Sequence, residues 1–323
     1  MRPVHKALAG ALLGTLVMAA CGQTGTTSGP APTAPDRTAT AQTGTATADA
    51  AFPVTVEAAN GRITIEKKPE RIVSLSASHT ETLFAIGAGP QVVAADEQSN
   101  HPPEAPRTKL SGFKPNVEAI VAYKPDLVVV SDDIDQVVSG LAKLNVPVLL
   151  EPAATTFDEA YDEILDFGAA TGNREKAEQV VADMKAELNQ LAASAPKGRG
   201  LTYYHELDQT PYAVTSKTFI GQVYGLFGLE NIADEAPGAA GGYPKLSAEF
   251  VAQADPDLIF LADVKCCGQN RDALAKRPGW KDLSAVRNDR VIELDDDIAS
   301  RWGPRVVDLA RTIGDAVAKA AAE

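Results

Sequence analysis

Three histidines beyond the N-terminal segment, His79, His101 and His205, carry the side chains best suited to bind a metal directly. His79 is expected to open a helix, His101 to lie in a loop and His205 to end a strand, so all three could border one cleft. Three histidines and a carboxylate would hold zinc or manganese. Each histidine alone is more often a polar loop residue, so a direct metal site is one alternative for this chain.

Catalytic motifs are absent from the sequence, which contains no G-x-S-x-G, Walker A, G-x-G-x-x-G or H-E-x-x-H pattern. Paired acids could hydrolyse glycosidic bonds, but a chain with 43 Asp and Glu residues offers such pairs by chance. We therefore expect no enzyme, and a cell-surface hydrolase is the least favoured alternative.

Length and charge narrow the class of protein. The 323 residues suffice for two domains of ordinary size. A net charge of −13 argues against partners such as nucleic acid and against adsorption to anionic lipid. Outside the N-terminus, no apolar run approaches the roughly 20 residues that span a bilayer.

A phrase that occurs twice indicates how the chain is organised. Residues 117–133 read VEAIVAYKPDLVVVSDD and residues 248–264 read AEFVAQADPDLIFLADV, with Glu118 and Glu249 eight residues before the aspartate of each Pro-Asp-Leu. Each copy predicts a short helix, a stop at the proline and a strand buried on both faces, as in a parallel sheet. Two copies about 130 residues apart predict two similar lobes rather than a solenoid.

The elements around these copies alternate between strands and helices, which predicts an α/β fold with two doubly wound parallel sheets. A hairpin around Asn60-Gly61 opens the first lobe, and Ser78–Glu81 has the spacing of a capping box that opens a helix. Residues 157–194 are helical with a break at Thr171-Gly172-Asn173, and the helix Arg174–Ser194 is expected to join the lobes as one rigid connector. The predicted parts are a first lobe (53–155), a helical connector (156–196) and a second lobe (197–323).

Ligands of open parallel sheets bind at the loops beyond the carboxyl ends of the strands. That rule selects five loops, namely Ser76–His79, Gln98–Pro115, His205–Tyr212, Gly238–Pro244 and Asp296–Pro304.

The N-terminal residues predict a signal peptide followed by a tether. A positive region with Arg2 and Lys6 precedes the apolar run Ala7–Ala20, and Val17–Cys21 resembles a bacterial lipobox. Residues 1–20 are thus expected to be a lipoprotein signal peptide, with lipid attached to Cys21 and a polar tether over residues 21–52.

Two cysteines then remain, and they are neighbours. Cys266 and Cys267 are expected either to form a vicinal disulfide or to stay as buried thiols.

The segments RIVSLSASHTETLFAIGAG, HPPEA, NVEAIVAYKPDLVVV and GLENIADEA…YPKLSAEFVAQADPDLIFL resemble the substrate-binding proteins of ABC importers for iron-siderophores, haem and vitamin B12. The resemblance implies the class III (cluster A) binding-protein fold, in which one long helix joins two lobes and the ligand occupies the cleft. It implies a monomeric, extracytoplasmic, lipid-anchored protein that serves an ABC permease and its ATPase. It also assigns Glu118 and Glu249 to docking on permease arginines.

The same resemblance implies a ligand and the residues that bind it. The expected ligand is an iron(III)-siderophore, with vitamin B12 or haem as alternatives, and the protein itself needs no cofactor. Phe113 lies where the B12 binders carry a tryptophan, whereas Gln98 replaces an aromatic residue of those binders. Related zinc and manganese binders carry a His- and acid-rich loop that this sequence lacks. The implied ligand-binding residues are Gln98, Phe113, Lys114, Tyr243, Arg301 and Trp302, with Arg301 and Lys114 as partners for an anionic ligand.

Overall fold

The structure is a computed structural model that describes residues 52–198 and 200–322. The predicted signal peptide, Cys21 and nearly all of the predicted tether lie outside the described residues. Within the described residues, no helix is both long enough and apolar enough to cross a bilayer.

An antiparallel hairpin of β1 (Val54–Ala58) and β2 (Gly61–Ile65) opens the described chain. The hairpin was predicted, but its turn lies one residue earlier than expected, because Ala58 pairs with Gly61 and Gly61 takes the positive φ of 103°. The Asn60 side chain contacts the parallel sheet of the first lobe. It donates to the carbonyl of Val148 at 3.0 Å.

The first lobe contains a parallel sheet of four strands in the order β4-β3-β5-β6. Every residue of β5 is buried, as expected for a strand covered on both faces. The elements of this lobe are β3 (Ile72–Ser74), α1 (Ala77–Ala85), η1 (Gly89–Gln91), β4 (Val92–Ala95), α2 (Val117–Val121), β5 (Leu127–Val130), η2 (Ile134–Gln136), α3 (Val137–Ala142) and β6 (Val148–Leu150).

The second lobe contains another parallel sheet of four strands, in the order β10-β9-β7-β8. The short elements β8, α8, α9 and α11 were not predicted. The elements of this lobe are β7 (Thr202–Glu206), α6 (Phe219–Gly225), β8 (Glu230–Asn231), η3 (Ile232–Glu235), η4 (Ala239–Gly241), α7 (Ala248–Ala254), β9 (Leu258–Leu261), α8 (Val264–Cys267), α9 (Arg271–Ala275), η5 (Trp280–Asp282), α10 (Ser284–Arg287), β10 (Val291–Glu293), α11 (Asp296–Ala299) and α12 (Val306–Ala321).

The repeated phrase forms the same structure in both lobes: a short helix (α2 or α7) followed by a fully buried strand (β5 or β9). The residue before each proline, Lys124 or Asp255, takes a left-handed conformation with φ of 51° or 44°. Both helices end before the proline, at Val121 and Ala254, as predicted, but the residue before the proline is left-handed and not extended as expected.

The aspartate of each Pro-Asp-Leu ties two strands together at their starts. Asp126 accepts the backbone N–H groups of Glu70 and Arg71 at 3.0 and 2.9 Å, just before β3. In the second lobe Asp257 accepts the N–H and the hydroxyl of Thr202, the first residue of β7, at 2.9 and 3.1 Å. This shared role explains why the aspartate occurs in both copies.

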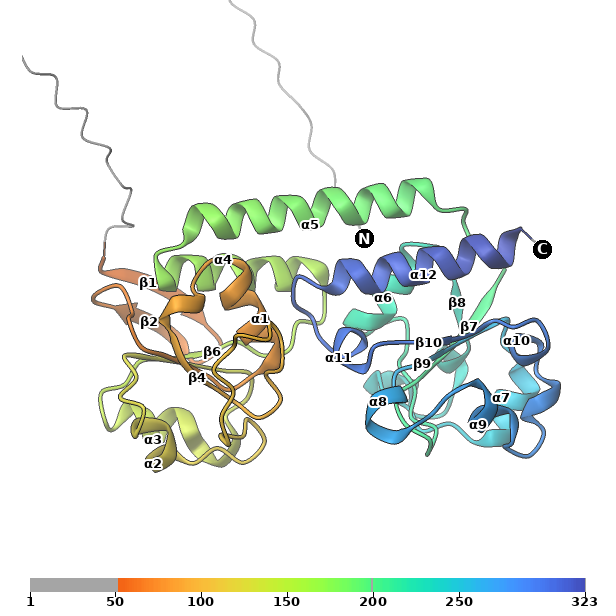
Figure 1. Ribbon diagram of the computed structural model, residues 1–323, viewed down its shortest axis with the longest axis horizontal. Helices are drawn as coiled ribbons and strands as arrows, with labels where there is room; N and C mark the ends of the chain where they lie inside the picture. The colour runs from red at the N-terminus through yellow and green to blue at the C-terminus, as the bar shows by residue number, and fades with distance from the viewer. Residues whose placement is uncertain (1–51, 199, 323) are drawn as a thin grey trace, which may run out of the picture. The chain divides into compact units, whose positions relative to one another are not determined.

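Two long helices, α4 (Phe157–Thr171) and α5 (Arg174–Ser194), confirm the predicted helical region and its break. Thr156 and Glu159 form a capping box at the start of α4, and Gly172 ends it with a φ of 71°. Figure 1 shows α5 running beside both α4 and α12, and it packs against each. The connector is therefore not a lone helix, because these three helices form one layer along both lobes.

One hydrophobic core runs through this layer and into both lobes. Its buried members include Val56 of β1, Phe167 of α4, Leu188 of α5, Tyr203 of β7 and Val317 of α12. Each lobe has a separate cluster on the other face of its sheet. Because a close-packed core resists deformation, the shared cluster restricts rotation of one lobe against the other.

A buried ionic clasp also joins the lobes. Glu81 of α1 is 3% exposed and accepts hydrogen bonds from two arginines of the second lobe. Arg305 donates from Nε and Nη2 at 2.8 and 2.5 Å, and Arg301 donates from Nη1 at 2.5 Å. The predicted capping box of Ser78 and Glu81 is wrong, since α1 begins at Ala77 and the Glu81 carboxylate points to the arginines.

Replacement of Glu81 tests the clasp. We expect Glu81→Ala to lower the free energy of unfolding by about 3 kcal/mol, because the buried Arg301 and the half-buried Arg305 lose their shared partner. The measurement is urea denaturation of the purified protein. Glu57→Ala is the matched control, since Glu57 pairs with Arg62 on the exposed hairpin and should contribute at most about 1 kcal/mol. Equal losses in the two variants would contradict the clasp.

Candidate functional site

A cleft of about 440 Å³ lies where the first lobe meets residues 297–302 of the second. On the first-lobe side its walls follow the ends of β3, β4 and β5, as predicted from the rule for parallel sheets. The lining residues are Leu75, Ser76, Ala77, Ser78, Asp96, Gln98, Gly112, Phe113, Ser131, Asp132, Ile134, Ala153, Asp297, Ser300, Arg301 and Trp302.

Four of the predicted ligand-binding residues line this cleft, namely Gln98, Phe113, Arg301 and Trp302. Phe113 is 70% exposed, which leaves its ring available to a ligand. Lys114 is exposed beside it but does not line the cleft, and neither does Tyr243 of the second lobe, which is 52% exposed. That any of these residues contacts the ligand stays a prediction.

Arg301 is already engaged within the protein. Besides Glu81, its guanidinium donates from Nη2 to Asp297 at 2.8 Å, to the Asn100 side chain at 2.9 Å and to the carbonyl of Gln98 at 3.0 Å. Only 8% of the residue is exposed. Arg301 was predicted to pair with an anionic ligand, but two carboxylates neutralise its charge in this structure.

Three aspartates, Asp96, Asp132 and Asp297, are the acidic residues that line the cleft. Burial raises the pKa of Asp96, although hydrogen bonds from Ser99 and nearby backbone groups oppose that shift. Burial would also raise the pKa of Asp297, but Asn100, Arg301 and Lys265 together hold it below its ordinary value. Asp297 is therefore ionised at neutral pH, and the cleft carries no uncompensated positive charge among its lining residues.

A hydrogen bond to Glu163 of α4 holds Trp302 in position. Its indole Nε1–H donates to Glu163 at 2.8 Å, and His79 packs edge-on against the ring at a centroid distance of 6.0 Å. Burial raises the pKa of Glu163 well above its ordinary value and, with the nearby Asp166 charge, raises that of Glu151 to about 8. A largely neutral buried layer thus supports the tryptophan at the cleft.

The three histidines do not form a metal site. His79 and His205 are completely buried, and burial lowers the pKa of each to about 3. His205 shares a 2.7 Å hydrogen bond with the Tyr224 hydroxyl. Within residues 52–198 and 200–322, no three His, Cys, Asp or Glu side chains are grouped to bind an ion. The metal-site alternative was wrong because core packing, not the cleft, holds two of its ligands.

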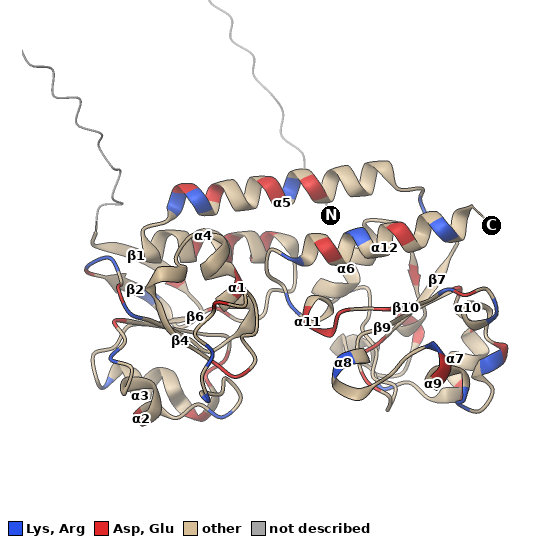
Figure 2. Cartoon of the chain, in the orientation of Figure 1, with Lys and Arg blue, Asp and Glu red and all other residues tan. Residues whose placement is uncertain are grey.

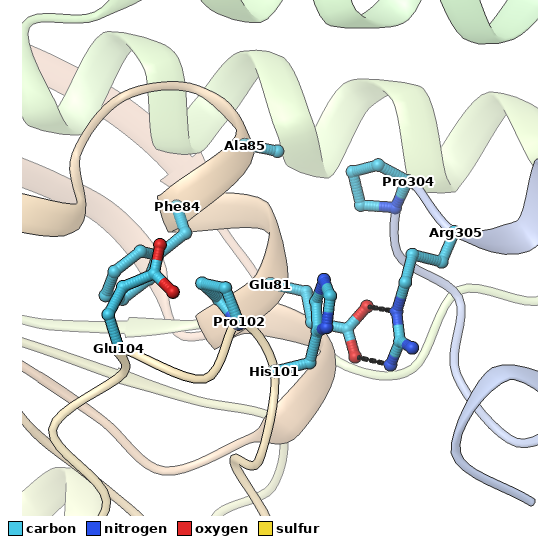
Figure 3. Close-up of a pocket in the computed structure, with 8 residues that line it drawn as sticks. All are labelled: Glu81, Phe84, Ala85, His101, Pro102, Glu104, Pro304 and Arg305. Atoms are coloured by element: carbon cyan, nitrogen blue, oxygen red, sulfur yellow. Dashed lines mark hydrogen bonds and ion pairs between the residues drawn. The ribbon is translucent and has the colours of Figure 1, made fainter.

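The third histidine, His101, lines a separate pocket of about 250 Å³ behind the clasp. Figure 3 shows Glu81 and Arg305 paired at one end of this pocket, with His101 and Pro102 beside them and Phe84 and Glu104 at the other end. Glu81 and Arg305 of the clasp therefore line an open pocket.

Glu118 and Glu249 occupy matching places in the two lobes. Each is the second residue of its helix, after a capping side chain: Asn116 accepts the N–H of Ala119 at 2.8 Å, and Ser247 accepts that of Phe250 at 3.0 Å. Both glutamates are exposed and neither forms an ion pair within the described residues. Figure 1 places α2 and α7 on the side away from α5, and Figure 2 marks acidic residues on both helices.

The second lobe carries two surface features that the sequence interpretation did not assign to the site. Tyr212 is 40% exposed in one of the selected loops, where the Lys245 ammonium lies over its ring. Cys266 and Cys267 form a disulfide on α8, and both residues are exposed, so they are not buried thiols. The selection of the loop could have found Tyr212, whereas no prediction included α8.

Comparison with known proteins identifies the fold and the family. The family model described as periplasmic binding protein matches residues 72–298. The ABC transporter substrate-binding lipoprotein YvrC of Bacillus subtilis strain 168 is 30% identical over 277 residues, which cover 82% of this chain and 86% of that protein.

Two solved structures share the fold of the described residues. The periplasmic vitamin B12 binding protein BtuF of Vibrio cholerae is 26% identical with a TM-score of 0.64, and the match covers 79% of this chain and 98% of that one. The periplasmic haem-binding protein RhuT of Roseiflexus sp. RS-1 is 27% identical with a TM-score of 0.65, and the match covers 77% and 99%.

These matches confirm the predicted fold class, with two α/β lobes and parallel sheets. They also agree with the expectation of no catalysis, because the family is a group of non-enzymatic substrate-binding proteins. From the match over residues 72–298 and the similarity to YvrC, the chain belongs to the periplasmic binding protein family.

Proposed function

We propose that this protein captures a metal chelate outside the cytoplasm, in the cleft between its lobes, and delivers it to an ABC permease. The family membership and the names of the relatives support this role. The cleft supports it too, because it combines an exposed aromatic ring, Phe113, with the apolar side chains of Leu75 and Ile134 and with polar groups that could orient a ligand.

The charge of the cleft selects among the possible chelates. Arg301, the one basic residue among its lining residues, is neutralised by Glu81 and Asp297, while Asp96 and Asp132 add acidic groups. A strongly anionic iron(III)-siderophore, such as a tris-catecholate, would meet like charges there and find no unpaired cation among the lining residues, which do not include Lys114. The neutralisation of Arg301 is the observation that carries the choice of ligand.

A neutral or cationic chelate fits this cleft better. The corrinoid vitamin B12 is our first choice, and relatives of this chain are named as binding it. A neutral or cationic iron(III)-hydroxamate siderophore is the second candidate, favoured by the acidic lining. Haem is less favoured, because its carboxylates need cations and no histidine, tyrosine or cysteine lines the cleft.

The permease contact is proposed for Glu118 and Glu249. Their matching positions, their exposure and the lack of an ion pair within the described residues suit two equivalent contacts with a two-fold permease. Carboxylates would accept charge-assisted hydrogen bonds from permease arginines, and bidentate pairs would also orient the protein.

The proposed anchor is a lipid on Cys21, after removal of residues 1–20, with the protein acting as a monomer. A polar tether of about 30 residues has an end-to-end distance of roughly 30 Å, which would let the lobes reach a permease in the same membrane. The relative YvrC is named as a lipoprotein, which supports this anchor.

Binding of four probes tests the ligand. We expect isothermal titration to give micromolar or tighter binding of cyanocobalamin, with haemin and a ferric tris-catecholate at least about tenfold weaker, a difference of about 1.4 kcal/mol. Ferrioxamine B, a cationic ferric hydroxamate, is the fourth probe. Preference for the tris-catecholate would overturn the charge argument.

The role of Phe113 in that binding can be tested separately. Loss of about 100 Å² of aromatic contact is worth about 2.5 kcal/mol gross, so Phe113→Ala should weaken binding by about tenfold or more. The matched control is Leu144→Ala, which removes another exposed apolar side chain outside the cleft. A similar effect of both variants would exclude a specific contact at Phe113.

Uptake by cells tests the docking glutamates. We expect Glu118→Ala/Glu249→Ala to abolish most transport of the ligand while its Kd stays unchanged, because the ligand cleft is intact. The control is Glu175→Ala/Glu178→Ala, which removes two exposed glutamates from α5 on the other side of the lobes. Unchanged uptake by the first double variant would end the docking proposal.

A further inference from the structure

The exposed Cys266–Cys267 disulfide is the feature of the second lobe that the proposed function has not used. It lies on α8, which follows the carboxyl end of β9 after two residues. Figure 1 shows α8 on the flank of the second lobe that faces the first. The disulfide is thus at the edge of the second sheet where ligand loops are expected.

The internal repeat gives this segment a counterpart in the first lobe. The two copies begin at residues 117 and 248, so Ser131, Asp132 and Ile134 align with residues 262, 263 and 265. Those three first-lobe residues line the cleft. The next two positions in the second copy are Cys266 and Cys267. By the repeat, the disulfide directly follows the positions on the second lobe that correspond to the cleft wall on the first, and its own counterparts, Asp135 and Gln136, directly follow the lining residue Ile134.

Hydrogen bonds hold α8 against a residue of the cleft wall. The Asp296 carboxylate accepts the backbone N–H groups of Val264, Lys265 and Cys266 at 2.9, 3.1 and 2.8 Å. The Lys265 ammonium donates to Asp297, which lines the cleft, at 3.2 Å. The disulfide is therefore fixed next to the wall by both main-chain and side-chain contacts.

The chemistry of a disulfide suits contact with a metal chelate. Its two sulfurs are soft and polarisable and carry no N–H or O–H group that needs a partner, so a flat apolar ligand can cover them without loss of hydrogen bonds. Two thiolates at the same place would instead be strong metal ligands and would compete for the metal of the chelate. The oxidised pair gives contact without coordination.

We propose that the Cys266–Cys267 disulfide is a ligand-contacting surface on the second-lobe wall of the cleft, opposite Phe113. This inference rests on the proposed function, since it takes the ligand to be a metal chelate. The chelate lies between an aromatic ring on one lobe and a disulfide on the other, and neither contact depends on the charge of the ligand.

Titration of a double variant tests the contribution to affinity. The probes are cyanocobalamin, haemin and ferrioxamine B, without reductant, and the wild-type protein defines which of them bind. We expect Cys266→Ser/Cys267→Ser to bind that probe about tenfold more weakly. The matched control Lys281→Ser/Asp282→Ser changes two exposed neighbours on η5 and should bind like the wild type. Thermal unfolding of each variant verifies that it is folded.

Alkylation of the reduced wild-type protein tests contact directly. A phosphine reduces the disulfide to two thiols, with water supplying the two protons and the oxygen of the phosphine oxide. After the phosphine is removed, a bound probe should slow alkylation of Cys266 and Cys267 by about tenfold or more, measured by mass spectrometry. Alkylation at the same rate with and without the probe would overturn the contact, whatever the double variant shows. If the wild type binds none of the three probes, the proposed function fails and this contact with it.

Discussion

The arrangement of the two lobes depends on the buried carboxylate of Glu81. Taking this carboxylate and the Arg301 guanidinium out of water is costly, and close hydrogen bonds of Glu81 with both Arg301 and the half-buried Arg305 offset that cost. Asp297 supplies the second negative charge, so two acids and two arginines form a neutral group at the junction. The same contacts that join the lobes therefore neutralise Arg301, the one basic residue among those that line the cleft, so the architecture and the proposed ligand charge share one physical cause.

The clasp and the shared core together make a rigid binding protein. The core continues from Phe167 of α4 through Leu188 of α5 to Val317 of α12, and rotation of the lobes would have to disturb both it and the Glu81 pairs. Such a frame opposes a large rotation of one lobe against the other. A ligand then meets a largely preformed cleft, which lowers the ordering cost of binding. Trp302 is one example, because Glu163 holds its indole before any ligand arrives.

Periodicity and the repeated phrase were enough to predict both sheets, the break at Gly172 and the matching positions of Glu118 and Glu249, because these depend on local patterns. Local patterns failed where tertiary contacts decide the outcome. Glu81 has the spacing of a capping residue, but its partners lie 220 and 224 residues away in sequence. His79 and His205 look like loop-edge ligands, and only the packing of α4 and α6 shows them to be buried. Arg301 was predicted as a ligand-binding residue and lines the cleft; its pair with Asp297, four residues earlier, is local, but nothing in the nearby sequence indicates its pair with Glu81.

The two copies of the phrase differ in a way that suits the two roles proposed for them. Their helix starts keep the same exposed glutamate, and their strand starts keep the same clamping aspartate. Beyond the strands they diverge: Asp132 is exposed in the cleft, whereas its counterpart Asp263 is buried and its pKa is raised to about 7 by burial and by Glu206. The first copy then continues into an open wall, and the second into the helix that carries the disulfide. A two-fold permease calls for equivalent contacts, while an asymmetric chelate calls for different ones, so a shared glutamate and different structures beyond the strands suit the roles proposed for the two copies.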